Sequence, residues 1–170
     1  IHCGLVGSEM CIRDSSGAVR SKNGFKSITE NATTGALVSD MTLSTYTANI
    51  TIAASGTAFK ESSIGIPSNF IPMGVAITVT SATTNNVNIN DIGTDADTDG
   101  FVDGISAGLN STGFKGFFPC NGVLGMSGGT TTAATETADE VEMIISGAAG
   151  GSGGAVSLKF FGISSNSPTA

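Results

Sequence analysis

The 170-residue chain has no tryptophan, a single tyrosine, a single histidine and only 7 lysines and arginines together. With so few cations it cannot form a continuous basic track along phosphates, so we predict that it does not bind nucleic acid. No stretch approaches the roughly 18 consecutive apolar residues of a membrane-spanning helix, so no membrane span is predicted. These shortages leave functions that need neither a basic surface nor a membrane-spanning segment.

Cysteine is also scarce and unevenly placed. Cys3 and Cys11 lie with His2 in Ile1–Ser15, which lacks the basic start and apolar run of a signal peptide. This segment resembles an adapter-derived, non-native leader, the alternative being a short natural extension, and we expect residues 1–21 to lie outside the fold. Cys120 is then the only cysteine of the domain, so neither a disulfide framework nor a cysteine metal cluster is predicted. It follows two phenylalanines and a proline and is expected to be a small buried residue.

The charges that are present are mostly negative. Acidic residues outnumber basic ones by 14 to 7, and the pI is about 4.4. Charged residues make up only 12% of the chain, so its polar surface must come from threonine, serine, asparagine and the 24 glycines. An acidic surface suits divalent cations and keeps crowded copies soluble.

Apolar residues recur at every second position, which is the period of a strand with one buried face. Thr45–Ala54 shows this best, with tyrosine, alanine and isoleucine on one face and threonine and asparagine on the other. Helix signals are scarce, because glycine and threonine are spread throughout. Further strands are expected at Val75–Thr80, Val87–Ile89, Glu140–Ile145 and Val156–Phe160, with weaker signals at Gly24–Thr29, Ala36–Leu43, Phe101–Ile105 and Lys115–Phe118.

Two antiparallel pairings are expected between neighbours in sequence: a hairpin through the Thr83–Asn86 turn, and a second pair across Gly147–Gly154. Many short strands indicate an all-β fold, which we predict to be an antiparallel β-sandwich or jelly-roll-like single domain over residues 22–163, with a flexible tail at 164–170. The predicted core consists of Ile50, Ile52, Val75, Ile77, Val79, Ile89, Val141, Met143, Ile145, Val156, Leu158 and Phe160.

The segment Asp91–Gly104 holds the one metal-like motif. Asp95, Asp97, Asp99 and Asp103 follow the pattern D-x-D-x-D-G-x-x-D, which resembles the first nine positions of an EF-hand or dockerin-type calcium loop. Alternating carboxylates on a tight loop can supply several of the oxygens that calcium takes. The twelfth position is Ser106 where such loops usually have a glutamate, so a site here would be weak. The alternative is a hydrated Asp/Gly loop between two strands.

No catalytic set stands out, so we predict that the protein is not an enzyme. His2 lies in the leader, which leaves no histidine base for a serine or cysteine nucleophile. Paired-carboxylate hydrolysis with Asp91 to Asp103, or with Glu140 and Glu142, would need the acids to converge in a cleft. The two glutamates alternate with apolar residues, so a solvated strand face is expected for them.

Ile66–Asp103 carries a recognisable order of features: an Ile-Pro step, an apolar alternating stretch, the Gly-Asp loop Ile92–Asp95 and the start of the phenylalanine-containing segment Gly100–Ile105. With a later strand like Val156–Phe161, it is similar to small β-rich virion structural proteins of tailed bacteriophages, including decoration, head-fibre and tail-associated proteins. The resemblance covers about half of the chain, rests on loose motifs and supplies no fixed binding residues.

The resemblance implies a virion structural protein that decorates or projects from a capsid or tail. Its expected partners are capsid or tail proteins and its own copies in a homo-oligomer, and its expected location is the virion. The residues alone also allow a secreted bacterial binding module or filament subunit, located outside the cell, whose Asp-rich loop calcium would stabilise.

Overall fold

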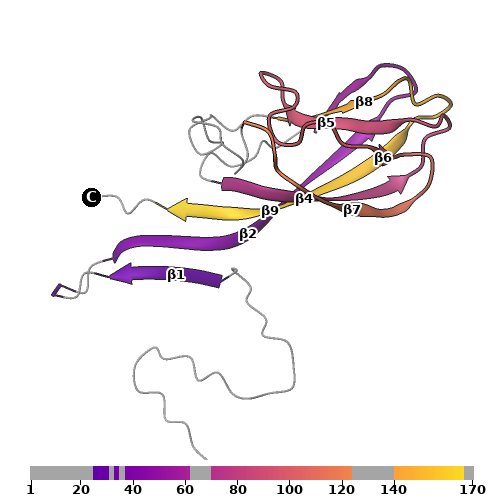
Figure 1. Ribbon diagram of the computed structural model, residues 1–170. Coiled ribbons are helices and arrows are strands. Elements are labelled where there is room, and N and C mark those ends of the chain that lie inside the picture. The colour runs from indigo at the N-terminus through magenta and orange to yellow at the C-terminus, as the bar shows by residue number, and fades with distance from the viewer. Residues whose placement is uncertain (1–24, 31–32, 35–36, 62–69, 124–139, 167–170) are drawn as a thin grey trace, which may run out of the picture.

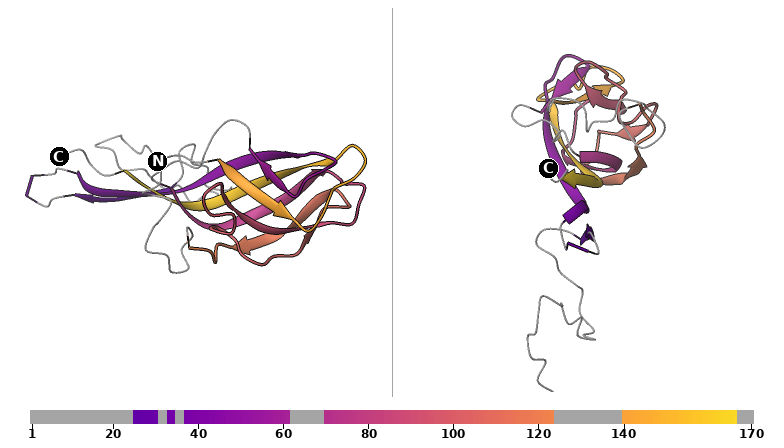
Figure 2. Two further views of the ribbon diagram at one scale, coloured as in Figure 1. Left: turned by 90° about the horizontal axis from the view of Figure 1, so that it is seen from above. Right: turned by 90° about the vertical axis from the view of Figure 1, so that its left-hand side faces the viewer.

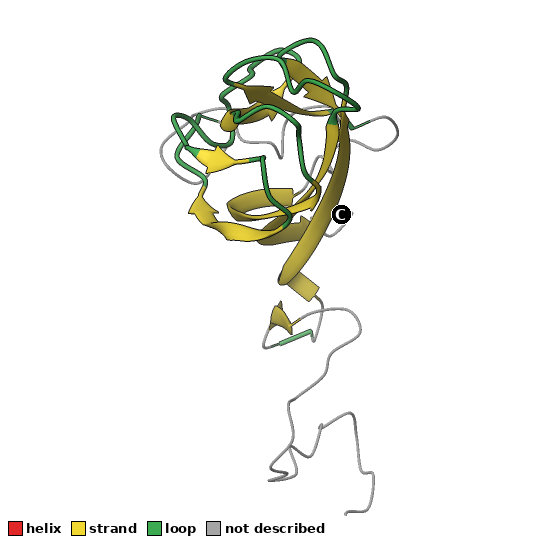
Figure 3. Cartoon of the chain, turned by 90° about the vertical axis from the view of Figure 1, so that its right-hand side faces the viewer, coloured by secondary structure: helices red, strands yellow, loops and turns green. Residues whose placement is uncertain are grey.

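The computed structural model describes residues 25–30, 33–34, 37–61, 70–123 and 140–166, and every regular element among them is a strand (Figures 1 and 3). Since no helix occurs in these ranges, they include no helical segment of the length and hydrophobicity needed to cross a bilayer. The strands are β1 Phe25–Glu30, β2 Leu37–Ile52, β3 Ala58–Lys60, β4 Phe70–Ser81, β5 Asn88–Thr94, β6 Ala107–Gly108, β7 Gly113–Pro119, β8 Val141–Ile145 and β9 Gly154–Asn166.

The strands form two packed antiparallel sheets, a five-stranded one in the order β1-β2-β9-β4-β7 and a four-stranded one in the order β3-β8-β5-β6. Four pairs are nested: β2 with β9, β3 with β8, β4 with β7 and β5 with β6. The chain from β2 to β9 therefore resembles one long hairpin that is folded over, and its successive strand pairs lie alternately in the larger and the smaller sheet. This is the jelly-roll arrangement of a β-sandwich, and the predicted fold class is confirmed, with β1 added beside β2.

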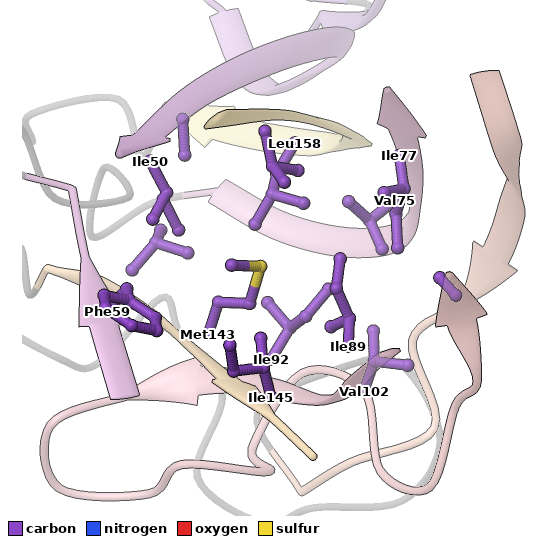
Figure 4. Close-up of a cluster of buried hydrophobic side chains, with 14 of the residues drawn as sticks. Ile50, Phe59, Val75, Ile77, Ile89, Ile92, Val102, Met143, Ile145 and Leu158 are labelled. Carbon is purple, nitrogen blue, oxygen red and sulfur yellow. The ribbon is translucent and has the colours of Figure 1, made fainter. Parts of the chain in front are cut away.

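The core lies between the two sheets, and all of the predicted core residues are buried in it. Figure 4 shows Ile50, Val75, Ile77 and Leu158 of the larger sheet facing Ile89, Ile92, Met143 and Ile145 of the smaller one. The outward positions between them on β2, from Thr45 to Thr51, are exposed. Because successive side chains of a strand point to opposite faces, period-two apolar spacing in the sequence becomes one buried and one wet face.

Both predicted pairings between sequence neighbours are wrong. β4 and β5 belong to different sheets, as do β8 and β9, so the Thr83–Asn86 and Gly147–Gly154 segments connect the sheets and do not close hairpins. Thr83 N–H donates to the Leu109 carbonyl (2.9 Å) and Asn85 N–H to the Ala149 carbonyl (2.8 Å), which fixes the first connection to loops distant in sequence. The two-residue spacing of apolar positions determines which face of a strand is buried, but it does not determine which strand lies beside it. In a jelly roll the chain passes from one sheet to the other at these connections.

Two further expectations need correction. Phe101–Ile105 forms only an isolated bridge between Val102 and Ile92. The N–H groups of Phe101 and Val102 both donate to the Ile92 carbonyl (2.9 and 2.8 Å), a tight crossing that buries both side chains without a strand. β9 continues to Asn166, so residues 164–166, which were expected in the tail, pair with β2. The expected leader, 1–21, lies outside the described residues.

β2 is 16 residues long and extends past the sandwich. Its first part pairs with β1, from Phe25 opposite Leu43 to Glu30 opposite Leu37. Figures 1 and 2 show that β1 and this part of β2 project to one side, away from the four-stranded sheet. We call β1 and Leu37–Leu43 the arm.

Candidate interaction surface

The Asp-rich segment is a compact loop that is held by backbone contacts. Thr94 N–H and Gly100 N–H donate to the Asp97 carbonyl at 2.8 and 3.1 Å. Asp103 N–H donates to Asn121 Oδ1 (2.9 Å), and Asn121 Nδ2 donates back to the Asp103 carbonyl (3.0 Å). A Cβ built on Gly93 would overlap the Asp97 carbonyl oxygen, so this glycine allows the loop to fold down onto β5.

The loop does not gather its four acids into one ligand set. Asp95 forms an ion pair with Lys60 of β3, while the main chain of Asp103 is tied to Asn121. Within the described ranges, which include Asp95, Asp97, Asp99 and Asp103, no group of three or more His, Cys, Asp or Glu side chains lies close enough to hold a metal. The described residues therefore give no support to the predicted calcium site, which a calcium titration can test.

Glu142 does not lie on the solvated strand face that we expected from the sequence, since it is only 7% exposed. Its Cα is registered opposite Lys60 on β3 and Gly93 on β5, so it lies in the middle of the smaller sheet. The pKa of Lys60 is raised, first by its hydrogen bond to Asp95 and further by the charges of Asp95, Glu142 and Glu140, and only in part offset by desolvation. A lysine with a raised pKa is protonated near neutral pH, so Lys60 is a partner for carboxylates and not a nucleophilic amine.

Glu61 is a buried carboxylate that the sequence analysis missed. Tyr46 Oη donates to its Oε2 (2.6 Å) and Asn49 N–H to its Oε1 (3.1 Å). Its own N–H donates to the Val141 carbonyl (3.0 Å), so Glu61 links β2 of one sheet to β8 of the other. Burial raises the pKa of Tyr46, and the hydrogen bond and charge of Glu61 add to the rise, so the phenol remains a donor. This pair joins the two sheets and presents no reactive group.

Cys120 is buried, as predicted. Burial raises the pKa of its thiol to about 12, so the thiolate needed for nucleophilic attack is not available near neutral pH. The residue serves as a small apolar side chain in the core.

The outer face of the larger sheet carries an apolar patch, which we define as Leu43, Ile71, Phe117, Phe161 and Ile163. Ile163 is opposite Leu43 on one side and Ile71 on the other. Phe161 is opposite Gly74, and a Cβ on Gly74 would overlap the Phe117 ring, so the two phenylalanines lie on either side of a glycine. Exposed fractions of 55% for Phe117, 41% for Leu43 and 37% for Phe161 are high for large apolar side chains.

Among the described residues, the strands around the patch carry lysines but no acid outside the arm: Lys159 lies on β9 and Lys115 on β7. The other outward positions of β2 and β9 carry threonine, asparagine, serine and alanine, together with Lys159, which is exposed. Apart from the arm, the acidic residues of the described chain belong to the smaller sheet and to its loops, as Asp91, Asp95 and Glu140 illustrate. Among the described residues outside the arm, the outer face of the larger sheet therefore combines an apolar patch with polar residues and lysines, whereas the acids lie on the side of the smaller sheet. An exposed apolar patch that is rimmed by polar residues is typical of a surface that binds protein.

No protein-family model matches the chain, and no curated protein or solved structure is significantly similar to it.

Proposed function

We propose that the protein is a non-enzymatic virion structural protein that decorates or projects from a phage capsid or tail and assembles as an oligomer. The apolar patch on the outer face of the larger sheet is the observation that supports this most directly. Jelly rolls recur in viral capsid domains, but they host other functions too. The proposal therefore depends on the patch and on the resemblance of Ile66–Asp103 to virion proteins.

The patch is suited to a flat protein surface. Phe117 and Phe161 are exposed aromatic anchors on rigid strands, which lose little side-chain entropy on binding. Lys159 is on the same outward face of β9 as Phe161 and favours an opposing carboxylate. A capsid or tail surface with an apolar area and an acidic group would complement this face.

The experiment is co-sedimentation with purified virions or empty capsids of the phage whose genome encodes the chain. The double variant Phe117→Ser/Phe161→Ser is expected to bind roughly 1,000-fold more weakly, because central aromatic residues of an interface commonly contribute about 2 kcal/mol each. Val123→Ser is the matched control, since Val123 is also an exposed apolar residue, at 53%, but lies outside the larger sheet. Unchanged binding of the double variant, or no binding of the unaltered chain, would count against the proposal.

A calcium titration separates the proposed function from the secreted binding module. Because Asp95, Asp97, Asp99 and Asp103 do not form a ligand set, we expect calcium to leave the melting temperature unchanged. A site with a Kd of about 10⁻⁴ M would instead raise it by roughly 5–10 °C at about 10 mM calcium. A rise that Asp97→Ala abolishes and Glu140→Ala retains would contradict the expectation and favour the secreted module.

A further inference from the structure

β1 is an edge strand of the larger sheet. Among the described strands β1 pairs with β2 alone, so the backbone groups on its other side have no strand partner there. An unprotected edge is a template for pairing with another chain. The arm is narrow, since beside β1 and β2 it has only the end of β9 opposite Asp40–Leu43, so an added strand would strengthen it.

The other edges of the two sheets are poor templates. β3 has 3 residues and β6 has 2, which is too short for a lasting pair. β7 contains Gly113 and Gly116 at φ values of 112° and 144°, and its register with β4 shifts between Ile77 and Thr78. By contrast, β1 has 6 residues and contains neither glycine nor proline. Bulges and short strands are the devices that protect edges. The register of β1 with β2 shifts between Thr29 and Glu30, but the extra residue of this irregularity, Val38, belongs to β2, so β1 itself is continuous.

We propose that β1 pairs antiparallel with β1 of a second copy across a twofold axis at Ile28, which joins the two larger sheets into one. The proposal deepens the proposed function, on whose oligomeric assembly it rests, by naming the partner and the surface. A twofold interface is self-complementary, so each contact occurs twice. Main-chain hydrogen bonds across the edge would supply the affinity, as in other cases of β-strand addition.

Charge complementarity selects the register. With the axis at position 28, position 26 of one copy lies opposite position 30 of the other, and these positions are lysine and glutamate. Opposite charges directly across a strand pair are favourable, and symmetry provides two such pairs. With the axis between positions 27 and 28, the lysine would face Thr29 and the glutamate would face Phe25. The sequence of β1 therefore favours the first register.

A disulfide test locates the axis. In the full chain carrying Cys3→Ser and Cys11→Ser, the added substitution Ile28→Cys is expected to give a disulfide-linked dimer under mild oxidation. Residues directly opposite in an antiparallel pair have Cα atoms about 4.5 or 5.5 Å apart, and a disulfide spans about 4.4–6.8 Å. Thr33→Cys, in the exposed turn of the same hairpin, is the control and is expected to remain unlinked. Crosslinking at position 33 but not at position 28 would overturn the proposal.

A charge exchange tests the register by sedimentation velocity on the full chain. Lys26→Glu or Glu30→Lys alone replaces two attractive pairs by two repulsive ones, so each is expected to weaken the dimer about tenfold. The double variant Lys26→Glu/Glu30→Lys restores the pairs and is expected to restore the dimer. A monomeric unaltered chain, or a dimer insensitive to the single exchanges, would overturn the proposal.

Capsid co-sedimentation of the same variants keeps the two proposals distinguishable. If Ile28→Cys remains unlinked while the protein still binds capsids, the edge pairing is wrong and the virion function stands. If the dimer forms as described but neither capsids nor tails bind it, the edge pairing stands and the virion function is wrong.

Discussion

Replacing Phe160 with alanine is expected to lower the free energy of unfolding by about 4 kcal/mol, the largest effect of any single change considered for this chain. Phe160 is fully buried on β9 and lies opposite Tyr46 on β2 and Val75 on β4. Its ring packs edge-to-face on Phe101, with centroids 5.5 Å apart, and lies 6.2 Å from the Tyr46 ring. Alanine would leave a cavity between the sheets that strands on both sides cannot easily close.

Chemical denaturation and a thermal melt measure the effect, and the melting temperature should fall by roughly 10–15 °C. Phe161→Ala is the matched control, because it removes the same ring from the next position of the same strand. Phe161 points outward and is 37% exposed, so its removal is expected to cost under about 1 kcal/mol. Similar losses of unfolding free energy for the two variants would mean that the face of β9 that carries Phe160 is not the buried one.

Gly93→Ala is expected to destabilise the protein by about 3 kcal/mol, because a side chain at this position collides with backbone. Besides the overlap with the Asp97 carbonyl oxygen, the added Cβ would lie 2.6 Å from the Thr98 carbonyl carbon and 2.8 Å from the Gly100 nitrogen. To relieve these contacts the loop must lift off β5, which breaks the 2.8 Å hydrogen bond from Thr94 N–H to Asp97.

Limited proteolysis should then cleave the Asp95–Gly100 loop faster, in parallel with the loss of stability in denaturant. The control is Gly108→Ala in β6, where the nearest atom to an added Cβ is Asn88 Oδ1, at an ordinary 3.5 Å. That variant is expected to remain within about 1 kcal/mol of the unaltered chain. Equal stability of the two variants would show that the loop does not pack against β5 as described.

The part of the fold that could be predicted is which side chains are buried, because the two-residue spacing of apolar positions shows it. The burial of Ile50 and Leu158 could be predicted because both neighbours of each in the sequence are polar, and this information is local. The partner of each strand is not local information. β2 pairs with β9 through contacts such as Tyr46 with Phe160, more than a hundred residues apart, and no feature of either segment specifies the other.

The sites were less predictable than the fold, for a related reason. The acidic motif was visible because its residues are adjacent in sequence, but its backbone hydrogen bonds and the ion pair of Asp95 with Lys60 depend on a distant strand. Glu61 follows β3, which has only three residues and is too short to show an alternation of apolar and polar positions. The sequence pattern therefore did not indicate that Glu61 is buried against Tyr46. The apolar patch was also hidden, because Phe117 and Phe161 look like core residues until the faces of their strands are known.

The nesting of β2 with β9 has a consequence for biosynthesis. β9 is the central strand between β2 and β4, yet it is the last of the described strands to leave the ribosome. Until then the nascent chain has a gap in its larger sheet and exposes the apolar faces of β2 and β4. Such high contact order predicts folding on a time scale of milliseconds to seconds and after translation of β9, with exposure to aggregation before that point.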